Sequence, residues 1–450
     1  MNKNKIISIV GAILLLPALG SGQTLTLQQC KELTLQNNAA IEEANLNVKK
    51  AEQVKKEAFT NYFPTASVSA MAIKPTDYLI ETEVPAANLP VYDGNPANLA
   101  NPTQFAYFPG LQIKALDHVY TASATITQPI YAGGQIRNGN KLASIGVEAS
   151  KTYSQLSERD QLLQTETWYW QIASAIKQRE TIIKYEKLLN QLLKDVTISH
   201  KNGLIQKSDL LKIQLKLTET TVKKTQLNNA IEALTRALCQ HIGIEFNPLF
   251  NPSEVMIDSA TPDELFISPD STIQNMAEYQ LLERSLEAAN LEKKIAIGKN
   301  LPTLAIGGFT DFTDITDSYD NHMIGFVSLS IPITDWWKGS HQIKQKEIET
   351  AKAKLKLKDS REKLSMQQTI QYNQLIESWK NIDLGKAGLN EATEHLQDMT
   401  NNYAAGVVTV SDLLEAQAIY QEAESRYQSF QYSYLIEVAR YKSLTKQATL

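Results

Sequence analysis

Residues 401–424 read NNYAAGVVTVSDLLEAQAIYQEAE, and they decide the fold because residues 201–225 repeat their plan as KNGLIQKSDLLKIQLKLTETTVKKT. In both stretches a single glycine stands five residues before the string Ser-Asp-Leu-Leu: Gly203 precedes Ser208, and Gly406 precedes Ser411. A long run of mixed polar and apolar residues follows each string. Such a recurrence indicates an internal repeat. The sequence therefore predicts two copies of one structural unit.

The repeat extends upstream of the glycines. Pro129 and Pro332 are 203 residues apart, as the two glycines are (332 − 129 = 406 − 203). Farther upstream, Pro64 in FPT matches Pro302 in LPT at a separation of 238, so the first copy holds an insertion of 35 residues (238 − 203). Proline disfavours a helical conformation in the residue before it, so we place these four prolines at strand–helix junctions. Each copy is predicted to run helix, strand, loop, strand, very long helix, glycine turn, helix.

The chain divides into four predicted segments. They are a signal peptide at 1–22, a first repeat at 23–243, a linker at 244–270 and a second repeat at 271–450. Lys3 and Lys5 precede an apolar run that is typical of a secretory signal peptide. The region 74–118 holds six prolines and is predicted to be a long exposed loop. No later stretch is apolar over the roughly 18 residues that a membrane-spanning helix requires.

The predicted helices differ in length. The spacing of Thr26 and Gln29 predicts a capping box that opens a helix reaching to about residue 61. Residues 134–201 lack proline and predict a helix of roughly 100 Å at about 1.5 Å per residue. Such a length indicates a coiled coil or tube, in which two shorter helices stacked end to end lie beside one long helix. Apolar residues three and four apart support it; they are Ile182, Tyr185, Leu189, Leu192 and Val196, then Ile382, Gly385, Leu389, Ala392, Leu396, Met399 and Tyr403.

The last predicted helix carries a tyrosine at every seventh position. These residues are Tyr420, Tyr427, Tyr434 and Tyr441. An aromatic column at this spacing is expected to pack against neighbouring helices and not to form a ligand site.

Residues 65–73 and 119–127 alternate with a period of two, which predicts strands, and the second copy repeats the pattern less regularly. An apolar face opposite a hydroxyl-bearing face is typical of membrane β-barrel strands, although a half-buried soluble hairpin has the same pattern. In a barrel, the residues predicted to face lipid are Ala124, Ile126, Val327 and Leu329, and those predicted to face the lumen are Thr125, Thr127, Ser328 and Ser330.

The number of strands constrains the assembly. Four predicted strands cannot close a barrel, and open strand edges cannot face lipid because their N–H and C=O groups would lack partners. Single-chain barrels begin at about eight strands, so a barrel built from this chain requires an oligomer. A dimer would supply about eight strands (2 × 4) with little lumen, and a trimer about twelve (3 × 4) with an open channel.

Composition and motif spacing argue against catalysis and against nucleic-acid binding. Lys and Arg number 44 against 49 Asp and Glu, so a basic footprint is lacking. The six histidines do not have the spacing of a metal site, and no phosphate-binding loop occurs. We expect no enzyme activity and no cofactor. A cation site among Asp311, Asp314, Asp317 and Asp320 is an alternative to plain solvation of a loop, although the spacing fits no calcium motif.

Cys30 and Cys239 are the two cysteines of the chain. An even number of cysteines in a secreted protein is compatible with a disulfide. Each is expected several residues inside its helix, so end-to-end stacking would hold the two apart. A bridge would require helix ends that overlap sideways.

The order of these features resembles the TolC-type outer-membrane efflux proteins. The resemblance rests on the duplicated plan, the FPT/LPT and QPI/IPI junctions and the YxxG…SDLL turn, and it covers Thr26 to about Leu444. It implies an α+β membrane protein: a homotrimer whose coiled-coil α-helical tunnel in the periplasm continues into a 12-stranded β-barrel in outer-membrane lipid, with four strands per protomer.

The resemblance also implies a function. The protein would be the exit duct of a tripartite efflux or type I secretion system in a Gram-negative bacterium, joined to an inner-membrane pump through a periplasmic adaptor protein. It would not be an enzyme. The alternative function is that of a periplasmic coiled-coil adaptor without a barrel.

Acidic residues follow both glycine turns. Asp209 and Asp412 begin helices, where a negative charge complements the helix dipole without any channel. Glu415 lies three residues after Asp412 on the same helix face, and capping does not explain it. The resemblance implies that acidic positions near this tip narrow the closed pore and that Tyr403 helps to latch neighbouring helix pairs. Some relatives have an arginine in that latch where this chain has Val408.

We therefore hypothesise a gate at the tip. Asp412 and Glu415 would form a ring of carboxylates that binds cations, and Tyr403 and Asp209 would hold it closed until an adaptor docks on the surrounding turns. The turn residues predicted to contact the adaptor are Gly203, Leu204, Gly406 and Val407.

Overall fold

The computed structural model describes residues 24–248, 250–252, 260–315, 318–333 and 335–445, so the predicted signal peptide at 1–22 lies outside the described residues. The chain forms two compact units. Unit 1 comprises Met1–Lys49, Glu148–Arg284 and Leu355–Leu450, and unit 2 comprises Lys50–Val147 and Ser285–Lys354. Among the described residues, none of the helices combines the length and the apolar character that crossing a membrane demands.

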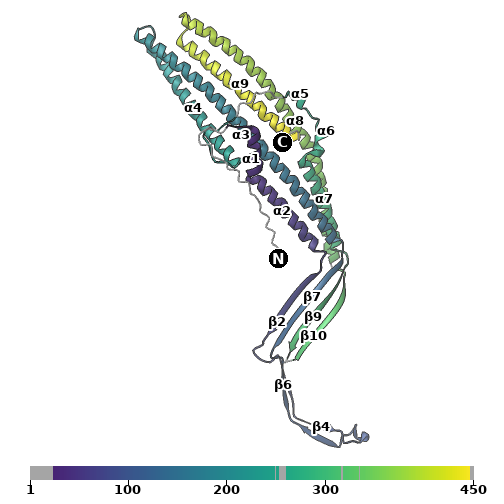
Figure 1. Ribbon diagram of the computed structural model, residues 1–450. Helices are drawn as coiled ribbons and strands as arrows, with labels where there is room; N and C mark the ends of the chain where they lie inside the picture. Colours follow the sequence, from purple (N-terminus) through teal and green to yellow (C-terminus); the bar gives the residue numbers. More distant parts are fainter. Residues whose placement is uncertain (1–23, 249, 253–259, 316–317, 334, 446–450) are drawn as a thin grey trace, which may run out of the picture. The chain divides into compact units, whose positions relative to one another are not determined.

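Four helices contribute residues to both units; they are α2 (Ala39–Thr60), α3 (Gln135–Lys201), α7 (Ala277–Gly298) and α8 (Asp335–Ala404). Unit 1 adds β1 (Thr24–Leu25), α1 (Leu27–Asn37), α4 (Lys207–His241), β8 (Asn251–Pro252), α5 (Pro262–Leu265), α6 (Pro269–Thr272), the 3-10 helix η2 (Ile273–Asn275) and α9 (Val410–Thr445). The long helices α3 and α8 have 67 and 70 residues, about twice the 35 and 36 of α4 and α9. In unit 1, α3 with α4 and α8 with α9 form antiparallel pairs (Figure 1).

The first helix begins as predicted and then breaks. The Thr26 hydroxyl accepts from the Gln29 N–H at 3.2 Å, and the Gln29 side chain accepts from the Thr26 N–H at 2.9 Å. The prediction of one helix to about residue 61 is wrong, because Asn38 is extended and separates α1 from α2. The Asn38 side-chain oxygen accepts from the backbone N–H groups of Ala40 and Ile41 and thereby caps α2.

Asn38 also joins the start of the chain to the end of α4. Its amide nitrogen donates to the His241 backbone carbonyl at 2.9 Å and lies 3.3 Å from Nδ1 of the same histidine. Nε2 of His241 lies 3.1 Å from the Gln161 carbonyl oxygen, so Nε2 carries the proton and Nδ1 accepts. Burial lowers the pKa of His241, and the bond to Gln161 opposes this only partly. The neutral imidazole therefore fits this site.

Unit 2 contains an antiparallel sheet in the order β10-β9-β7-β2, seen side by side in Figure 1. Its strands are β2 (Thr65–Ile73), β7 (Val119–Ala132), β9 (Thr303–Ile315) and β10 (Ser318–Ser330). β2 has the predicted bounds, whereas β7 continues past the predicted end at 127. Pro64, Pro302 and Pro332 lie between a helix and a strand, as predicted. Pro129 does not: it lies inside β7, where the register shifts before Tyr131, because a bulge accommodates its missing N–H.

The sheet register separates the two predicted faces. Ile126 lies opposite Gly308, which lies opposite Gly325, two residues before Val327 on the same strand. Directly paired residues and residues two apart share a face, so Ala124, Ile126, Val327 and Leu329 lie together. Thr125, Thr127, Ser328 and Ser330 occupy the opposite face. The larger side chains of the apolar face are exposed, and Val327 is 72% exposed.

The predicted loop at 74–118 is exposed, but it contains four short strands. It contains β3 (Ile80–Val84), β4 (Ala87–Val91), the 3-10 helix η1 (Pro96–Asn98), β5 (Gln104–Phe108) and β6 (Leu111–Ala115). β3 pairs with β6, and β4 and β5 pair between them in the chain, which gives one long antiparallel hairpin interrupted between its two strand pairs. The prolines are compatible with this arrangement: Pro85 and Pro109 stand between the two strand pairs, and Pro90 is in β4, a strand with one partner in the described chain.

The predicted acidic loop of the second copy is also mostly strand. Asp311 and Asp314 belong to β9, Asp320 belongs to β10, and Asp317 lies outside the described residues. Asp311 and Asp314 are three apart in one strand and therefore point to opposite faces. Within the described ranges, no group of three or more His, Cys, Asp or Glu side chains could hold a metal ion.

The turn between β7 and α3 requires glycine. Gly133 has φ 59°, and a Cβ there would lie 2.1 Å from the carbonyl oxygen of Gly298 at the end of α7. The approach is reciprocal, since a Cβ on Gly298 would lie 2.4 Å from the Gly133 carbonyl oxygen. Two backbones thus touch within unit 2 because both residues lack a side chain.

Candidate functional site

Two equivalent glycine turns join α3 to α4 and α8 to α9 in unit 1. Gly203 and Gly406 have φ 75° and 74°, the left-handed conformation that ends many helices. The N–H of the next residue reaches the carbonyl five residues back, at 3.0 Å for Leu204 and 2.9 Å for Val407. These two apolar side chains are 77% and 73% exposed. The two turns therefore present matching apolar residues to solvent.

One apolar core supports both turns. It contains Tyr185, Leu189, Leu192 and Val196 of α3, Ile213 of α4, and Val410, Leu413 and Leu414 of α9. Leu396, Met399 and Tyr403 of α8 pack against it. The predicted packing of the first apolar series is thus confirmed. The tyrosine column also packs, because Tyr434 and Tyr441 are fully buried beside Leu375.

Thr409 caps α9, and Asp412 completes a capping box with it. Its Oδ2 accepts from the Thr409 N–H at 2.8 Å and from the Thr409 hydroxyl at 2.7 Å. The Thr409 hydroxyl in turn accepts from the Asp412 N–H at 3.3 Å. These bonds hold the pKa of Asp412 below its usual value, which keeps it charged. Glu415, one turn farther along α9, is exposed.

A lysine that the sequence did not single out connects the two helix pairs. Lys212 of α4 donates to Oγ of Ser411 on α9 at 2.6 Å and to Oδ1 of Asp209 at 3.3 Å. Burial raises the pKa of Tyr403, and the carboxylates of Asp195 and Asp209 raise it further. Asp209 and Tyr403 therefore lie near enough for the carboxylate to act on the tyrosine hydroxyl. The three-residue spacing from Asp209 could have indicated Lys212, but its contact with Ser411 could not be foreseen.

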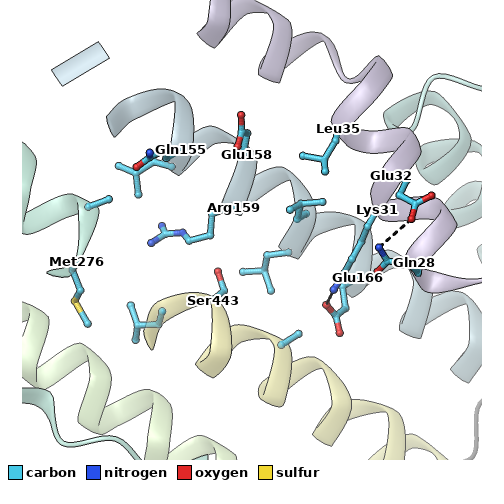
Figure 2. A pocket seen from close by; sticks show the side chains of 16 residues that line it. Gln28, Lys31, Glu32, Leu35, Gln155, Glu158, Arg159, Glu166, Met276 and Ser443 are labelled. Carbon is cyan, nitrogen blue, oxygen red and sulfur yellow. Dashed lines mark hydrogen bonds and ion pairs between the residues drawn. The ribbon is translucent and has the colours of Figure 1, made fainter. Parts of the chain in front are cut away.

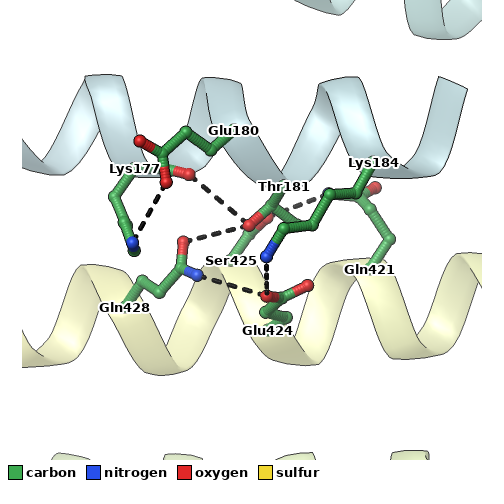
Figure 3. A network of polar contacts seen from close by, with 8 residues as sticks. All are labelled: Lys177, Glu180, Thr181, Lys184, Gln421, Glu424, Ser425 and Gln428. Atoms are coloured by element: carbon green, nitrogen blue, oxygen red, sulfur yellow. Dashed lines mark hydrogen bonds and ion pairs between the residues drawn. The ribbon is translucent and has the colours of Figure 1, made fainter. Parts of the chain in front are cut away.

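Above this group, the contact between α3 and α9 is polar (Figure 3). The buried Thr181 hydroxyl donates to the Gln428 side chain at 3.2 Å. Gln428 donates to Glu424 at 3.4 Å, and Lys184 lies 3.9 Å from the same carboxylate. Among the described residues, the buried Tyr185 hydroxyl has no partner. In addition to the apolar core, the two helix pairs are thus joined by hydrogen bonds.

A second region of unit 1 holds a cavity of about 480 Å³ lined by α1, α3, α7 and α9 (Figure 2). Its two cations are already paired. Lys31 lies 2.7 Å from Glu166, and Arg159 lies 2.8 Å from Asp160 and 2.7 Å from Glu278. Both cations of this hollow are thus held by carboxylates, and the remaining lining is a mixture of apolar and polar side chains.

Both cysteines are buried free thiols. Burial raises the pKa of Cys30 to about 12, with a smaller contribution from Cys239. End-to-end stacking of the two helices that carry Cys30 and Cys239 was the predicted arrangement, and it is wrong. The contacts of Asn37 with Ile242 and of Asn38 with His241 place the end of α4 against α1 and the α1–α2 junction.

Comparison with known proteins gives a consistent result. Residues 269–445 match the family described as "Outer membrane efflux protein". Over 342 residues the chain is 22% identical to "Outer membrane protein TolC" of Escherichia coli (strain K12), and the match covers 72% of this chain and 68% of that protein.

Solved structures share the fold. The outer membrane protein VceC of Vibrio cholerae is 14% identical with a TM-score of 0.73, over 93% of this chain and 96% of its own. The CmeC outer membrane channel of Campylobacter jejuni is 15% identical with a TM-score of 0.73, over 99% and 94%. The family match, the TolC relative and the shared fold together confirm the predicted resemblance of this chain to the TolC-type outer-membrane efflux proteins.

Proposed function

We propose that this protein is an outer-membrane efflux channel of a Gram-negative bacterium, the exit duct of a tripartite efflux or type I secretion system. The observation that carries the proposal is a four-stranded sheet with an exposed apolar face and two edge strands, β2 and β10, that have one partner each in the described chain. Such edges cannot face lipid unpaired. A periplasmic adaptor without a barrel would have no use for this sheet.

The assembly we propose is a homotrimer. Three copies supply twelve strands (3 × 4), and β2 of one copy pairs with β10 of the next to close a barrel with a lumen. Exposed apolar residues on two helices support contacts between copies; they are Leu211, Leu215 and Val222 on α4 and Leu355, Met366, Ile370 and Leu384 on α8. The helices of three copies would form a periplasmic tunnel. A dimer would leave little room for transport.

Leu204 and Val407 suit the docking of a periplasmic adaptor protein. Both are exposed apolar residues at structurally equivalent turns, and Gly203 and Gly406 fix their backbone. In a trimer the six turns form a ring, so repeated small apolar contacts add up to one multivalent interface. The adaptor would in turn connect the channel to an inner-membrane pump.

Purification and reconstitution test the proposed function. The protein extracted from outer membranes should have the native mass of a trimer in detergent and should form ion-conducting channels in planar lipid bilayers. A protein that fractionates with the inner membrane, or a trimer without conductance, would contradict the proposal.

The apolar sheet face provides a matched pair of variants. Val327→Arg should destabilise the barrel by about 2–4 kcal/mol, because a charge at mid-membrane depth on the lipid side is costly. Ser328→Arg, on the opposite face, should have a much smaller effect because the lumen is wet. The measurement is the temperature at which the trimer dissociates on a gel. Equal losses for the two variants would mean that the faces are assigned wrongly, since neighbouring residues in a strand alternate.

The acidic gate remains a hypothesis that the local geometry allows. We propose that Asp412 and Glu415 of three copies form a ring that favours cations, while Asp209, Tyr403 and the Lys212–Ser411 bond hold the helix pairs together. The double variant Asp412→Asn/Glu415→Gln should reduce cation preference and divalent block in single-channel recordings, because it removes charge while the new amide oxygen can still accept from the Thr409 N–H at the start of α9. Glu422→Gln, an exposed site farther along α9, should change neither. Unchanged selectivity in the double variant would leave only the capping role.

A further inference from the structure

The antiparallel pair of strands β3 and β6, called the ribbon below, has one apolar and one polar face. Its register pairs Ile80 with Ala115, Thr82 with Ile113 and Val84 with Leu111. Paired residues share a face, so these six residues form one apolar surface. The alternate pairs, Glu81 with Lys114 and Glu83 with Gln112, form the other face.

Three of the four residues on the polar face interact with one another. Lys114 lies 2.8 Å from Glu81, and the Gln112 amide donates to the same carboxylate at 2.7 Å. Lys114 also lies over the Tyr78 ring, 5.6 Å from its centroid. The apolar face has no such cover: Leu111 is 52% and Ile113 is 43% exposed. A two-stranded ribbon is only marginally stable in water, so this face needs a partner.

The segment beyond the ribbon is ordered and not a slack loop. The Asp93 carboxylate accepts from the Asn98 side chain and from the Thr103 hydroxyl, both at 2.7 Å, and from the Asn95 N–H at 3.0 Å. These bonds close the loop that joins β4 to β5. An ordered end on an exposed hairpin is consistent with a built interaction surface.

The net charge of the insertion and its connection to β2 indicate what covers the apolar face of the ribbon. Residues 74–118 contain two lysines and five acidic residues, a net charge of −3 (2 − 5) with His118 neutral. Negative charge disfavours an anionic lipid surface. The ribbon follows directly from β2, an edge strand of the sheet, and β2 is the edge at which the next copy joins in the proposed trimer. Identical ribbons would therefore begin at each junction between copies, at high effective concentration.

We propose that the apolar faces of the three ribbons pack against one another in the trimer and form a collar beyond the barrel strands. The acidic faces then point outward, where they do not repel one another at short range. This inference rests on the proposed trimeric channel. The collar would make the three insertions of the first repeat one structural element that narrows the outer opening.

Single-cysteine variants on adjacent residues test the collar. Ile113→Cys lies on the apolar face and Gln112→Cys on the polar face. Copper-phenanthroline oxidation of outer membranes should give covalent dimers with Ile113→Cys at a yield several-fold above that with Gln112→Cys. The wild-type chain is the blank, because Cys30 and Cys239 are buried. Native mass of each variant, measured before oxidation, confirms that the trimer is intact.

The remaining outcomes separate the collar from the channel. Equal or absent cross-linking in an intact trimer overturns the collar and leaves the proposed function standing. A monomeric native mass overturns both. A polarity-sensitive dye on Ile113→Cys that shifts only when lipopolysaccharide vesicles are added would mean that lipid covers the face. Cross-linking to another protein in place of a second copy would also overturn the collar.

Discussion

Gly133→Ala is expected to lower the free energy of unfolding by about 3 kcal/mol. The left-handed conformation of residue 133 costs an alanine about 1–2 kcal/mol. The new Cβ would also lie 2.1 Å from the Gly298 carbonyl oxygen, a backbone atom that cannot rotate away. Forcing such a contact apart typically costs a further 1–3 kcal/mol or so. The measurement is the denaturant midpoint of the detergent-solubilised protein followed by circular dichroism.

Gly139→Ala is the matched control. Gly139 lies in α3, only six residues along the chain, and a Cβ there would meet no atom within 4 Å. Alanine in a helix interior is favoured over glycine by about 0.5–1 kcal/mol, so this variant should be slightly more stable than the wild type. Similar losses for both variants would show that the contact of Gly133 with Gly298 is not the cause.

Asn38→Ala is expected to destabilise the protein by about 2–4 kcal/mol. Loss of the cap on α2 accounts for roughly 1 kcal/mol. The deletion also leaves the buried His241 carbonyl without the donor that Asn38 supplies, which costs about 1–3 kcal/mol. The same denaturation measurement applies.

Asn38→Asp separates the two contributions. Aspartate keeps an oxygen that can cap α2, but it cannot donate to His241 and instead places a negative charge beside the imidazole. That charge favours the imidazolium, so the pKa of His241 should rise from its lowered wild-type value. The C2-proton chemical shift of His241 followed against pH measures this change. An unchanged pKa in Asn38→Asp would mean that residue 38 does not contact the imidazole in solution.

The sequence predicted those parts of the fold whose causes are local. Pro64, Pro302 and Pro332 mark junctions because proline constrains its own backbone and that of the residue before it. Gly203 and Gly406 mark turns because they adopt positive φ. At Asn38 the cap on α2 is local, but the bond that holds this break against α4 joins Asn38 to His241, which is 203 residues away along the chain and could not be predicted from local sequence. Short strands in 74–118 were obscured by prolines that the edge positions tolerate.

The candidate site shows the same division. The sequence indicated that Asp412 lies in the first turn of a helix, and its bonds with Thr409 involve residues 409–412 alone. The bond between Lys212 and Ser411 joins residues 199 apart, and no pattern along the chain records it. How close Cys30 and Cys239 lie depends on the way α1 and α4 overlap. Side-chain packing determines this overlap, and the spacing of residues along the sequence does not.

The polar contact between α3 and α9 has a consequence for alignment along the helix axis. Apolar residues that repeat every seven positions leave two long helices nearly free to slide by one repeat, about 10 Å, because similar side chains meet again after the slip. Gln421 and Gln428 are themselves seven residues apart, so a slip in one direction would bring Gln421 to Thr181, whereas a slip in the other would bring the apolar Leu435 there. The hydrogen bond between Thr181 and Gln428 therefore opposes a slip in that second direction, and it helps to hold the turns at Gly203 and Gly406 at matching heights.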